Sequence, residues 1–330
     1  MPDLRNVDIS TTELVDQFGD YYLNNGQNMN NLHMLPYEPF GTAEEGTIYE
    51  TDQTVLREGN VRTEEVLQPY QHEFTPKGGV KILPISIFLQ NAKVDVKILP
   101  NQLKKSWAEF LLSNDLDPVA YPLVAYIIEK YLIPKVQEDL ELNAIYKGKY
   151  VAPEENVAGA ASEIMNGVET ILNELEAADK LDWITSGTVP TDVADFVDYV
   201  ENFVAAIPEK YRYKTKMCIQ MNRTLRDRFK KGMRKKYNTY YNQAGLPSGA
   251  TDNVTVMDHD NITICGQASM IGKNKIWCTP KENFIVPVKG FSNKSAFDVQ
   301  KIDRYVKFLS DWWIGVGFIQ PELIFATEQA

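Results

Sequence analysis

The alternation of apolar and charged residues between positions 73 and 100 constrains the fold most strongly. The alternating runs are Val80-Lys81-Ile82 and Lys93-Val94-Asp95-Val96-Lys97-Ile98. A period of two is typical of β-strands that are buried on one face only. Pro84 and Asn91 interrupt the pattern, so the sequence predicts a hairpin of two long strands. A two-stranded ribbon is marginally stable in isolation, and this one therefore needs another surface to lie on.

Residues 1–72 precede the predicted ribbon and contain few apolar side chains. Asn residues cluster at positions 24–31, and one amphipathic stretch, residues 14–22, has roughly helical spacing. Such a segment buries too little apolar surface to offset the entropy that it loses on ordering. We therefore expect an extended arm that becomes ordered only against neighbouring chains.

The longest predicted helix covers residues 118–146. Asp117 is suited to cap its N-terminus and Pro118 to occupy its first position, while Gly148 stops it. About 28 residues at ~1.5 Å each would form a rod of roughly 42 Å. Pro134 lies inside this helix and should kink it.

The remaining predicted elements mix helices and strands. In chain order they are a helix over 164–175, a helix over 193–207, a strand over 216–221, a helix from 222 with the apolar stripe Met221, Leu225, Phe229 and Met233, short strands at 254–257, 262–265 and 275–278, and long closing strands over 297–327 that return to an earlier sheet. Thr191 should cap the helix over 193–207, and Pro208 should end it. This order predicts an α+β fold.

Charge and cysteine content exclude several classes of protein. A formal net charge of -11 disfavours wrapping of DNA or adsorption to anionic membranes by the chain as a whole. The three cysteines, Cys218, Cys265 and Cys278, contain no CxxC pair, so we expect isolated buried thiols in a reducing cytoplasm. The start of the chain does not resemble a signal peptide, and the apolar run at 312–319 is too short to cross a bilayer.

No combination of residues predicts catalysis or a cofactor. The three histidines are His33, His72 and His259, and no GxSxG, P-loop or GxGxxG motif accompanies them. Asp258 and Asp260 flank His259 and could ligate a metal, but the segment is more typical of a turn between strands. We therefore predict that the chain is not an enzyme and that it has no cofactor and no metal site.

A basic block is the strongest local charge feature. It contains Arg223, Arg226, Arg228, Lys230, Lys231, Arg234, Lys235 and Lys236, against the single acid Asp227. The block could bind nucleic acid, dock onto a neighbour's acidic helix face, or form the solvated side of an amphipathic helix. Docking is the preferred hypothesis, and the acidic group with Glu138 and Glu141 is a candidate partner face.

The order of these parts resembles the major capsid proteins of tailed bacteriophages, which have the Hong-Kong-97-type coat fold. The segments that resemble the family most closely are Ile276-Trp277-Cys278-Thr279-Pro280-Lys281-Glu282-Asn283-Phe284-Ile285-Val286, and Asp311-Trp312-Trp313-Ile314-Gly315-Val316-Gly317-Phe318 running into Pro321-Glu322-Leu323-Ile324-Phe325.

The resemblance implies a domain organisation. Residues 1–72 would be the N-terminal arm, 73–105 the extended β-ribbon loop, 106–186 plus 284–330 the peripheral domain with spine helix 118–146, and 187–283 the axial domain.

The resemblance also implies function. Subunits made in the host cytoplasm would assemble into pentamers and hexamers of an icosahedral head in the virion. That head would enclose double-stranded DNA as weakly contacted cargo, with portal protein and scaffold or decoration proteins as further partners and no membrane. The residues expected at contacts between subunits are Arg223, Arg226, Arg228, Lys230, Lys231, Arg234, Lys81, Lys93, Lys97, Glu138 and Glu141. The alternative is a nucleic-acid-associated virion or regulatory protein that uses the basic helix at 223–236.

Overall fold

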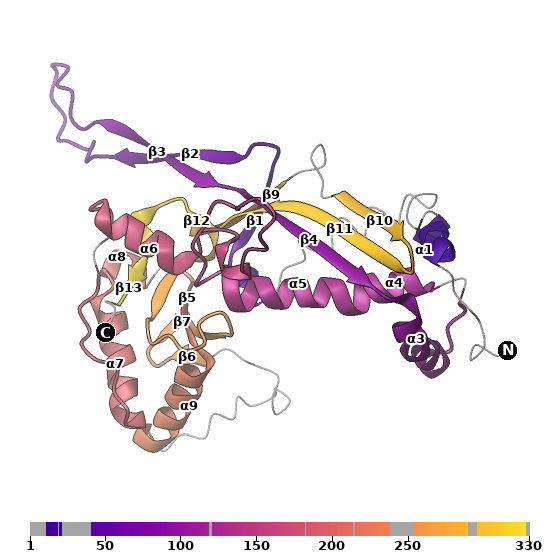
Figure 1. The fold of residues 1–330 in the computed structure, drawn as a ribbon. Helices are drawn as coiled ribbons and strands as arrows, with labels where there is room; N and C mark the ends of the chain where they lie inside the picture. Colours follow the sequence, from indigo (N-terminus) through magenta and orange to yellow (C-terminus); the bar gives the residue numbers. More distant parts are fainter. Residues whose placement is uncertain are drawn as a thin grey trace.

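The chain contains helices and strands in mixed order, and the predicted α+β class is confirmed. The computed structural model describes residues 11–18, 20–21, 41–118, 121–181, 183–213, 215–237, 254–289 and 296–327. These residues form a six-stranded sheet, a five-stranded sheet and a separate two-stranded ribbon (Figure 1). Among them, no helix is both long and apolar enough to cross a membrane.

The six-stranded sheet runs along the long axis of the molecule above the spine helix (Figure 1). Its strands are β1 (Thr47–Thr51), β4 (Gln90–Ile98), β9 (Phe284–Lys289), β10 (Ala296–Ile302), β11 (Tyr305–Ile314) and β12 (Gly317–Phe318). β11 is antiparallel to β4 and to β10, so the closing strands do return to an earlier sheet, as predicted. Every second residue of β11 is buried, which is the pattern of a sheet with one covered face.

The five-stranded sheet has the order β13-β8-β5-β7-β6. Its strands are β5 (Met217–Asn222), β6 (Val254–Val256), β7 (His259–Gln267), β8 (Trp277–Pro280) and β13 (Phe325–Ala326). Two helices, α7 (Val193–Ala206) and α9 (Arg223–Tyr237), pack on each other and share a core with this sheet. The predicted stripe Met221, Leu225, Phe229 and Met233 is buried in that core.

The spine helix begins later than predicted. Pro122 precedes α4 (Leu123–Ile127), which continues through a π-helical turn at Ile128–Leu132, α5 (Ile133–Asp139) and a second π-helical turn at Leu140–Ala144. The predicted start at Pro118, with Asp117 as its cap, is wrong because Pro122 lacks an N–H and disfavours helical dihedrals in the residue before it. The first π turn places Pro134 at the second position of α5, where a missing N–H costs little.

Other helical segments complete the fold. They are α1 (Thr11–Phe18), η4 (Gly41–Glu45), α3 (Pro100–Asn114), η7 (Ala161–Glu163), α6 (Val168–Ala177), α8 (Glu209–Arg212), η8 (Lys281–Asn283) and η10 (Pro321–Leu323). The sequence did not predict α3, and α6 begins four residues after the predicted start at 164. Asp192, and not Thr191, caps α7: its Oδ1 accepts the Ala194 N–H at 2.7 Å.

The predicted pairing of the two alternating strands is wrong. β3 (Val80–Phe88) is antiparallel to β2 (Val55–Thr63), whereas β4 pairs with β11 in the large sheet. The chain passes between the two sheets at the buried Leu89. Alternation identifies a half-buried strand but not its partner, so the ribbon is formed by residues 55–88 with its tip at 64–79.

The predicted arm is only partly described. Within residues 1–72, α1 packs against α4 and the β10–β11 strands, and β1 is parallel to β9. The expectation of an arm without intrachain partners is therefore wrong for these two segments. Helix α1 buries Leu14 and Phe18 against distant parts of the same chain, and β1 is held by its pairing with β9. Residues 1–10 and 22–40 lie outside the described residues.

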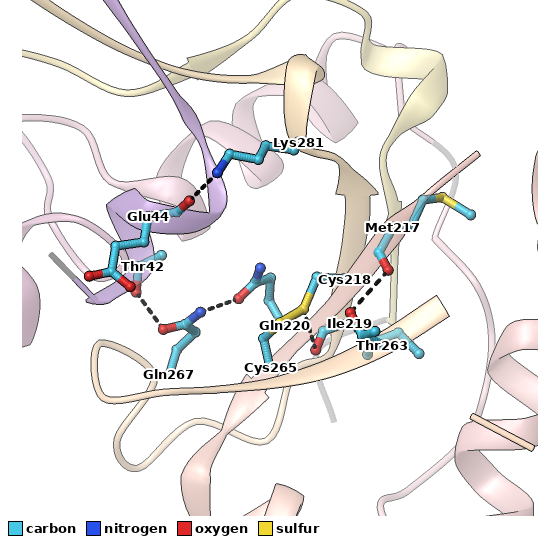
Figure 2. Close-up of a disulfide and its surroundings, with 10 residues drawn as sticks. All are labelled: Thr42, Glu44, Met217, Cys218, Ile219, Gln220, Thr263, Cys265, Gln267 and Lys281. Atoms are coloured by element: carbon cyan, nitrogen blue, oxygen red, sulfur yellow. Dashed lines mark hydrogen bonds between the residues drawn. A yellow bond between two sulfur atoms is a disulfide. The ribbon is translucent and has the colours of Figure 1, made fainter. Parts of the chain in front are cut away.

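Two of the three cysteines are bonded to each other, so the prediction of isolated thiols is wrong for them. Cys218 of β5 and Cys265 of β7 form a disulfide (Figure 2). Gln220 is the register partner of Cys265, so Cys218, two residues earlier, lies on the same face of the sheet. Their Cα atoms are 6.0 Å apart, within the range that a disulfide spans. The third cysteine, Cys278, is buried with a free thiol, and burial raises its pKa.

Candidate assembly surfaces

The ribbon formed by β2 and β3 projects from the body of the molecule (Figure 1). At its tip, Leu67, Tyr70 and Phe74 are 83%, 93% and 92% exposed. The tip loop is held by its own contacts: the Lys77 Nζ donates to the Leu67 carbonyl at 2.7 Å and pairs with Glu65 at 2.9 Å. The loop thus presents large apolar side chains to solvent, which is typical of interaction surfaces.

One face of β3 extends this apolar surface toward the body. Val80, Ile82 and Phe88 lie on the same face and are 64%, 67% and 61% exposed. At the base of the ribbon, Leu56 and Ile87 instead pack against Ile285 of the large sheet. The ribbon is therefore anchored at its base, while its outer length has an uncovered apolar face.

The three predicted lysine contacts lie on exposed strand surfaces with local partners. Lys81 pairs with Glu64 at 2.9 Å, and Lys93 pairs with Asp95 at 2.9 Å. The Lys97 Nζ lies 3.7 Å from the centre of the Tyr305 ring. Exposed pairs of this kind contribute little to stability, so these lysines can exchange their partners for groups on another surface.

The capping residue of α7 and an acidic residue within α7 neutralise part of the basic helix α9. Lys235 pairs with Asp192 at 2.8 Å, and Lys236 pairs with Glu201 at 2.9 Å. The Lys235 ammonium lowers the pKa of the Asp192 carboxyl. These acids lie about 35–43 positions from the lysines, so the charge count along α9 alone overstates its net positive charge.

Other basic side chains of α9 are tied to their own sheet and helices. The Arg226 Nη2 lies 3.1 Å from the Asp227 Oδ1, and a Cβ at Gly266 would lie 2.8 Å from the Arg226 Cδ. Gly266 therefore allows the Arg226 side chain to lie across β7. Arg228 donates to the Pro190 carbonyl at 2.7 Å, and its guanidinium carbon lies 5.6 Å from the centre of the Phe196 ring.

Three of the predicted contacts on α9 remain on the surface, and Lys230 is half-buried. Arg223, Lys231 and Arg234 are exposed, and the Arg234 Nε donates to the Lys230 carbonyl at 3.3 Å. The exposed basic side chains of α9 without an acidic partner described above are therefore fewer than the eight in the sequence block.

The two predicted acidic contacts have different environments. Glu138 is exposed and pairs with Lys135 at 3.0 Å. Glu141 is buried, so its predicted place on a solvated or partner face is wrong. Its carboxylate accepts hydrogen bonds from Thr42 N at 3.0 Å, Thr42 Oγ1 at 2.9 Å and Ser269 N at 3.1 Å. These donors come from segments distant in sequence, which helical periodicity cannot reveal. Burial raises the pKa of Glu141 against the effect of these hydrogen bonds.

Of the candidate metal triplet at 258–260, Asp258 lies in a turn between strands, as predicted, whereas His259 and Asp260 begin β7. Asp258 has a positive φ of 65° between β6 and β7, and the His259 ring lies 5.4 Å from that of Tyr213. His72 lies in the exposed ribbon tip, and His33 lies outside the described residues. A different group, Glu45 with Cys218 and Cys265, does bring three potential ligands together. The only sequence signal for it was the position of both cysteines on predicted strands.

Solved structures match the chain over nearly its whole length, although neither a protein-family model nor a curated protein sequence matches it. A structure described as the satellite phage P4 procapsid including size determination (Sid) protein is 12% identical, with a TM-score of 0.55, and the match covers 99% of this chain and 93% of the other. This chain has the fold of phage capsid proteins. The predicted capsid fold is therefore confirmed.

Two further structures support the capsid fold. The capsid of a native GTA particle is 12% identical with a TM-score of 0.51, over 87% of this chain and 89% of the other. The capsid of cyanophage A-1(L) is 13% identical with a TM-score of 0.50, over 90% of this chain and 92% of the other. These matches extend over most of this chain and of each solved chain, so the capsid fold is not confined to one part of this chain.

Proposed function

We propose that this chain is a major capsid protein that assembles into the shell of a phage head. Its subunits form pentamers and hexamers of an icosahedral shell that encloses double-stranded DNA, and the chain acts in the virion without catalysis. The observation that carries this proposal is the projecting ribbon with Leu67, Tyr70 and Phe74 exposed at its tip. The capsid fold over the whole chain supports it.

A second copy of the chain is the occupant that best suits the ribbon. The ribbon is two strands wide and is anchored by Leu56 and Ile87 at its base and by the Asn60 amide, which donates to Glu322 at 3.0 Å. Its outer part, beyond Asn60, gains stability by lying on another subunit. A lattice of identical subunits offers each ribbon the same surface. We assign the ribbon to the extended loop, the large sheet with the spine helix to the peripheral domain, and the five-stranded sheet with α7 and α9 to the axial domain.

Exposed charges provide complementary contacts in this assembly. Arg223, Lys231 and Arg234 at the surface of α9 face acidic helix surfaces of a neighbouring subunit, such as the one that carries Glu138. Lys81 on the ribbon, and Lys93 and Lys97 on β4, likewise pair with acidic groups of a neighbouring subunit. The chain has a net charge of -11, so packaged DNA is held by confinement more than by binding. Portal, scaffold and decoration proteins are the further partners expected of such a shell.

The assembly proposal is tested with the full-length chain made in a bacterial cytoplasm. Sedimentation velocity and negative-stain microscopy should show capsomer rings or particles. The double variant Leu67→Ser with Phe74→Ser should shift the distribution to monomers, because it removes the apolar tip. Val157→Ser, which changes an exposed residue outside the ribbon, is the matched control and should assemble normally. A wild-type chain that stays monomeric across salt and protein concentration refutes the proposal, as does normal assembly of the double variant.

The nucleic-acid alternative makes a different prediction. It requires DNA affinity that falls steeply with salt and that is lost in the variant Lys231→Glu with Arg234→Glu. The structure supports it less than assembly, because Lys235, Lys236, Arg226 and Arg228 already contact their own chain. Salt-dependent DNA binding by a wild-type chain that forms no particles would favour the alternative.

A further inference from the structure

Three potential metal ligands meet where η4 reaches the five-stranded sheet. Cys218 and Cys265 lie on one face of the adjacent parallel strands β5 and β7 (Figure 2). Glu45 is the last residue of η4, which directly precedes β1 of the large sheet. One carboxylate oxygen of Glu45 and the two sulfurs all lie within 4.8 Å of one another. The group therefore combines side chains from three elements at the junction of the two sheets.

The Glu45 carboxylate lies beside a single ammonium group among the described residues. The side chain is half-buried, and burial raises its pKa, while the nearby Lys281 ammonium acts in the opposite direction. The Lys281 Nζ itself donates to the Glu44 carbonyl at 2.7 Å (Figure 2). Within the described residues, no hydrogen bond reaches the Glu45 carboxylate. A half-buried carboxylate without a donor is costly, and a cation would offset that cost.

The donor atoms match a soft divalent cation. Thiolate sulfur and carboxylate oxygen bind Zn²⁺ at about 2.3 Å and 2.0–2.2 Å, and three protein ligands leave a fourth tetrahedral position for water. Two thiolates and one carboxylate together carry three negative charges, so a divalent cation leaves one. The Lys281 ammonium, which already acts on Glu45, balances that remaining charge.

We propose that, when Cys218 and Cys265 are reduced, these two thiolates and the Glu45 carboxylate bind one Zn²⁺ ion per chain. Each thiol loses its proton when it binds the metal. The disulfide form uses both sulfurs, so it and the metal form exclude each other. In the metal form the ion ties η4, and through it β1 of the large sheet, to β5 and β7 of the smaller sheet.

Cobalt provides a direct spectroscopic test on the full-length chain. Tris(carboxyethyl)phosphine first cleaves the disulfide: with one water it becomes the phosphine oxide, and both sulfurs become thiols. Anaerobic titration with Co²⁺ should then produce a thiolate-to-cobalt charge-transfer band that saturates at one equivalent and disappears when Zn²⁺ is added. Cys278→Ala removes the buried thiol that is outside the site and should leave the titration unchanged. The oxidised chain should give no band.

Substitutions of the ligands decide the outcome. Cys218→Ser and Cys265→Ser should each lose most of the band, and Glu45→Gln should weaken Co²⁺ binding at least about tenfold. Glu45→Gln keeps both thiols and nearly the same shape, so it tests the site even if a cysteine variant fails to fold. The proposal is overturned if the reduced wild type gives no band, or if Glu45→Gln binds Co²⁺ as tightly as the wild type. Particle formation is not used as a readout, so failure here leaves the assembly proposal standing.

Discussion

Gly232 lies where α9 crosses α7, and its replacement by alanine sets two opposing effects against each other. Alanine is favoured over glycine inside an exposed helix by about 1 kcal/mol. A Cβ at Gly232, however, would lie 1.9 Å from the Val193 carbonyl oxygen and 2.6 Å from the Val197 Cγ2. The first obstacle is backbone, so α7 and α9 must move apart. Overpacking of this kind costs about 1–3 kcal/mol, and the backbone contact places Gly232→Ala at the upper end.

We therefore expect Gly232→Ala to destabilise the chain by about 2 kcal/mol, since a cost near 3 exceeds a gain near 1. Urea unfolding monitored by circular dichroism measures this difference. Gly79→Ala is the matched control, because its Cβ would meet only the Glu64 Oε2 at 3.9 Å. That variant should stay within about 0.5 kcal/mol of the wild type. A Gly232→Ala chain that is as stable as the wild type, or more stable, would show that helix propensity and not the α7–α9 contact decides at this position.

Further measurements test the buried carboxylate, the helix cap and the disulfide. Burial raises the pKa of Glu141 in the folded chain, so the folded state keeps the Glu141 carboxyl protonated to higher pH than the unfolded state does. The free energy of unfolding contributed by this group therefore falls as pH rises from the unfolded-state pKa through the folded-state pKa. Urea midpoints over about pH 4–7 should show this fall, and Glu141→Gln should reduce it; equal slopes would contradict the assignment. Asp192→Ala should lose about 1 kcal/mol by removing the α7 cap, whereas Asp192→Asn keeps a capping oxygen and should lose less; equal losses would argue against the cap. Alkylation in denaturant without reductant should label one thiol per chain and, after reduction, all three; three labelled thiols without reductant would exclude the bond between Cys218 and Cys265.

Local amphipathic patterns predicted the helices that pack on the smaller sheet. The stripe through Leu225, Phe229 and Met233 has the helical period, and all three residues are buried. Helix α7 likewise ends where Pro208 predicts. These predictions succeed because the period of a helix depends on residues three and four positions apart. The same patterns placed α9 after a strand and so located the basic block correctly on one helix.

Features that depend on distant segments were not predictable in the same way. The partner of β3 is β2 and not β4, and both alternatives give the same alternation. Cys218 and Cys265 are 47 positions apart and meet only because β5 and β7 are neighbours in the sheet. Glu141 belongs to an acidic cluster in sequence, yet Thr42 and Ser269 bury its carboxylate. In each case the deciding contact comes from an element that the local pattern does not contain.

The alternation of apolar and charged residues in β3 predicts a half-buried strand, but the single chain leaves the apolar face of this strand exposed. Val80 and Ile82 alternate with Lys81 as in a half-buried strand, yet in the single chain both are about two-thirds exposed, at 64% and 67%. In β11 the same period coincides with actual burial, because Val306 and Phe308 pack against α1 and α4. Half-burial of β3 thus requires a cover that β2 alone does not provide. A neighbouring subunit over the outer ribbon would supply that cover, so hydrogen exchange at Val80 and Ile82 should slow on assembly while exchange in β11 stays the same. Equal exchange in β3 before and after particle formation would show that the ribbon is not covered in the shell.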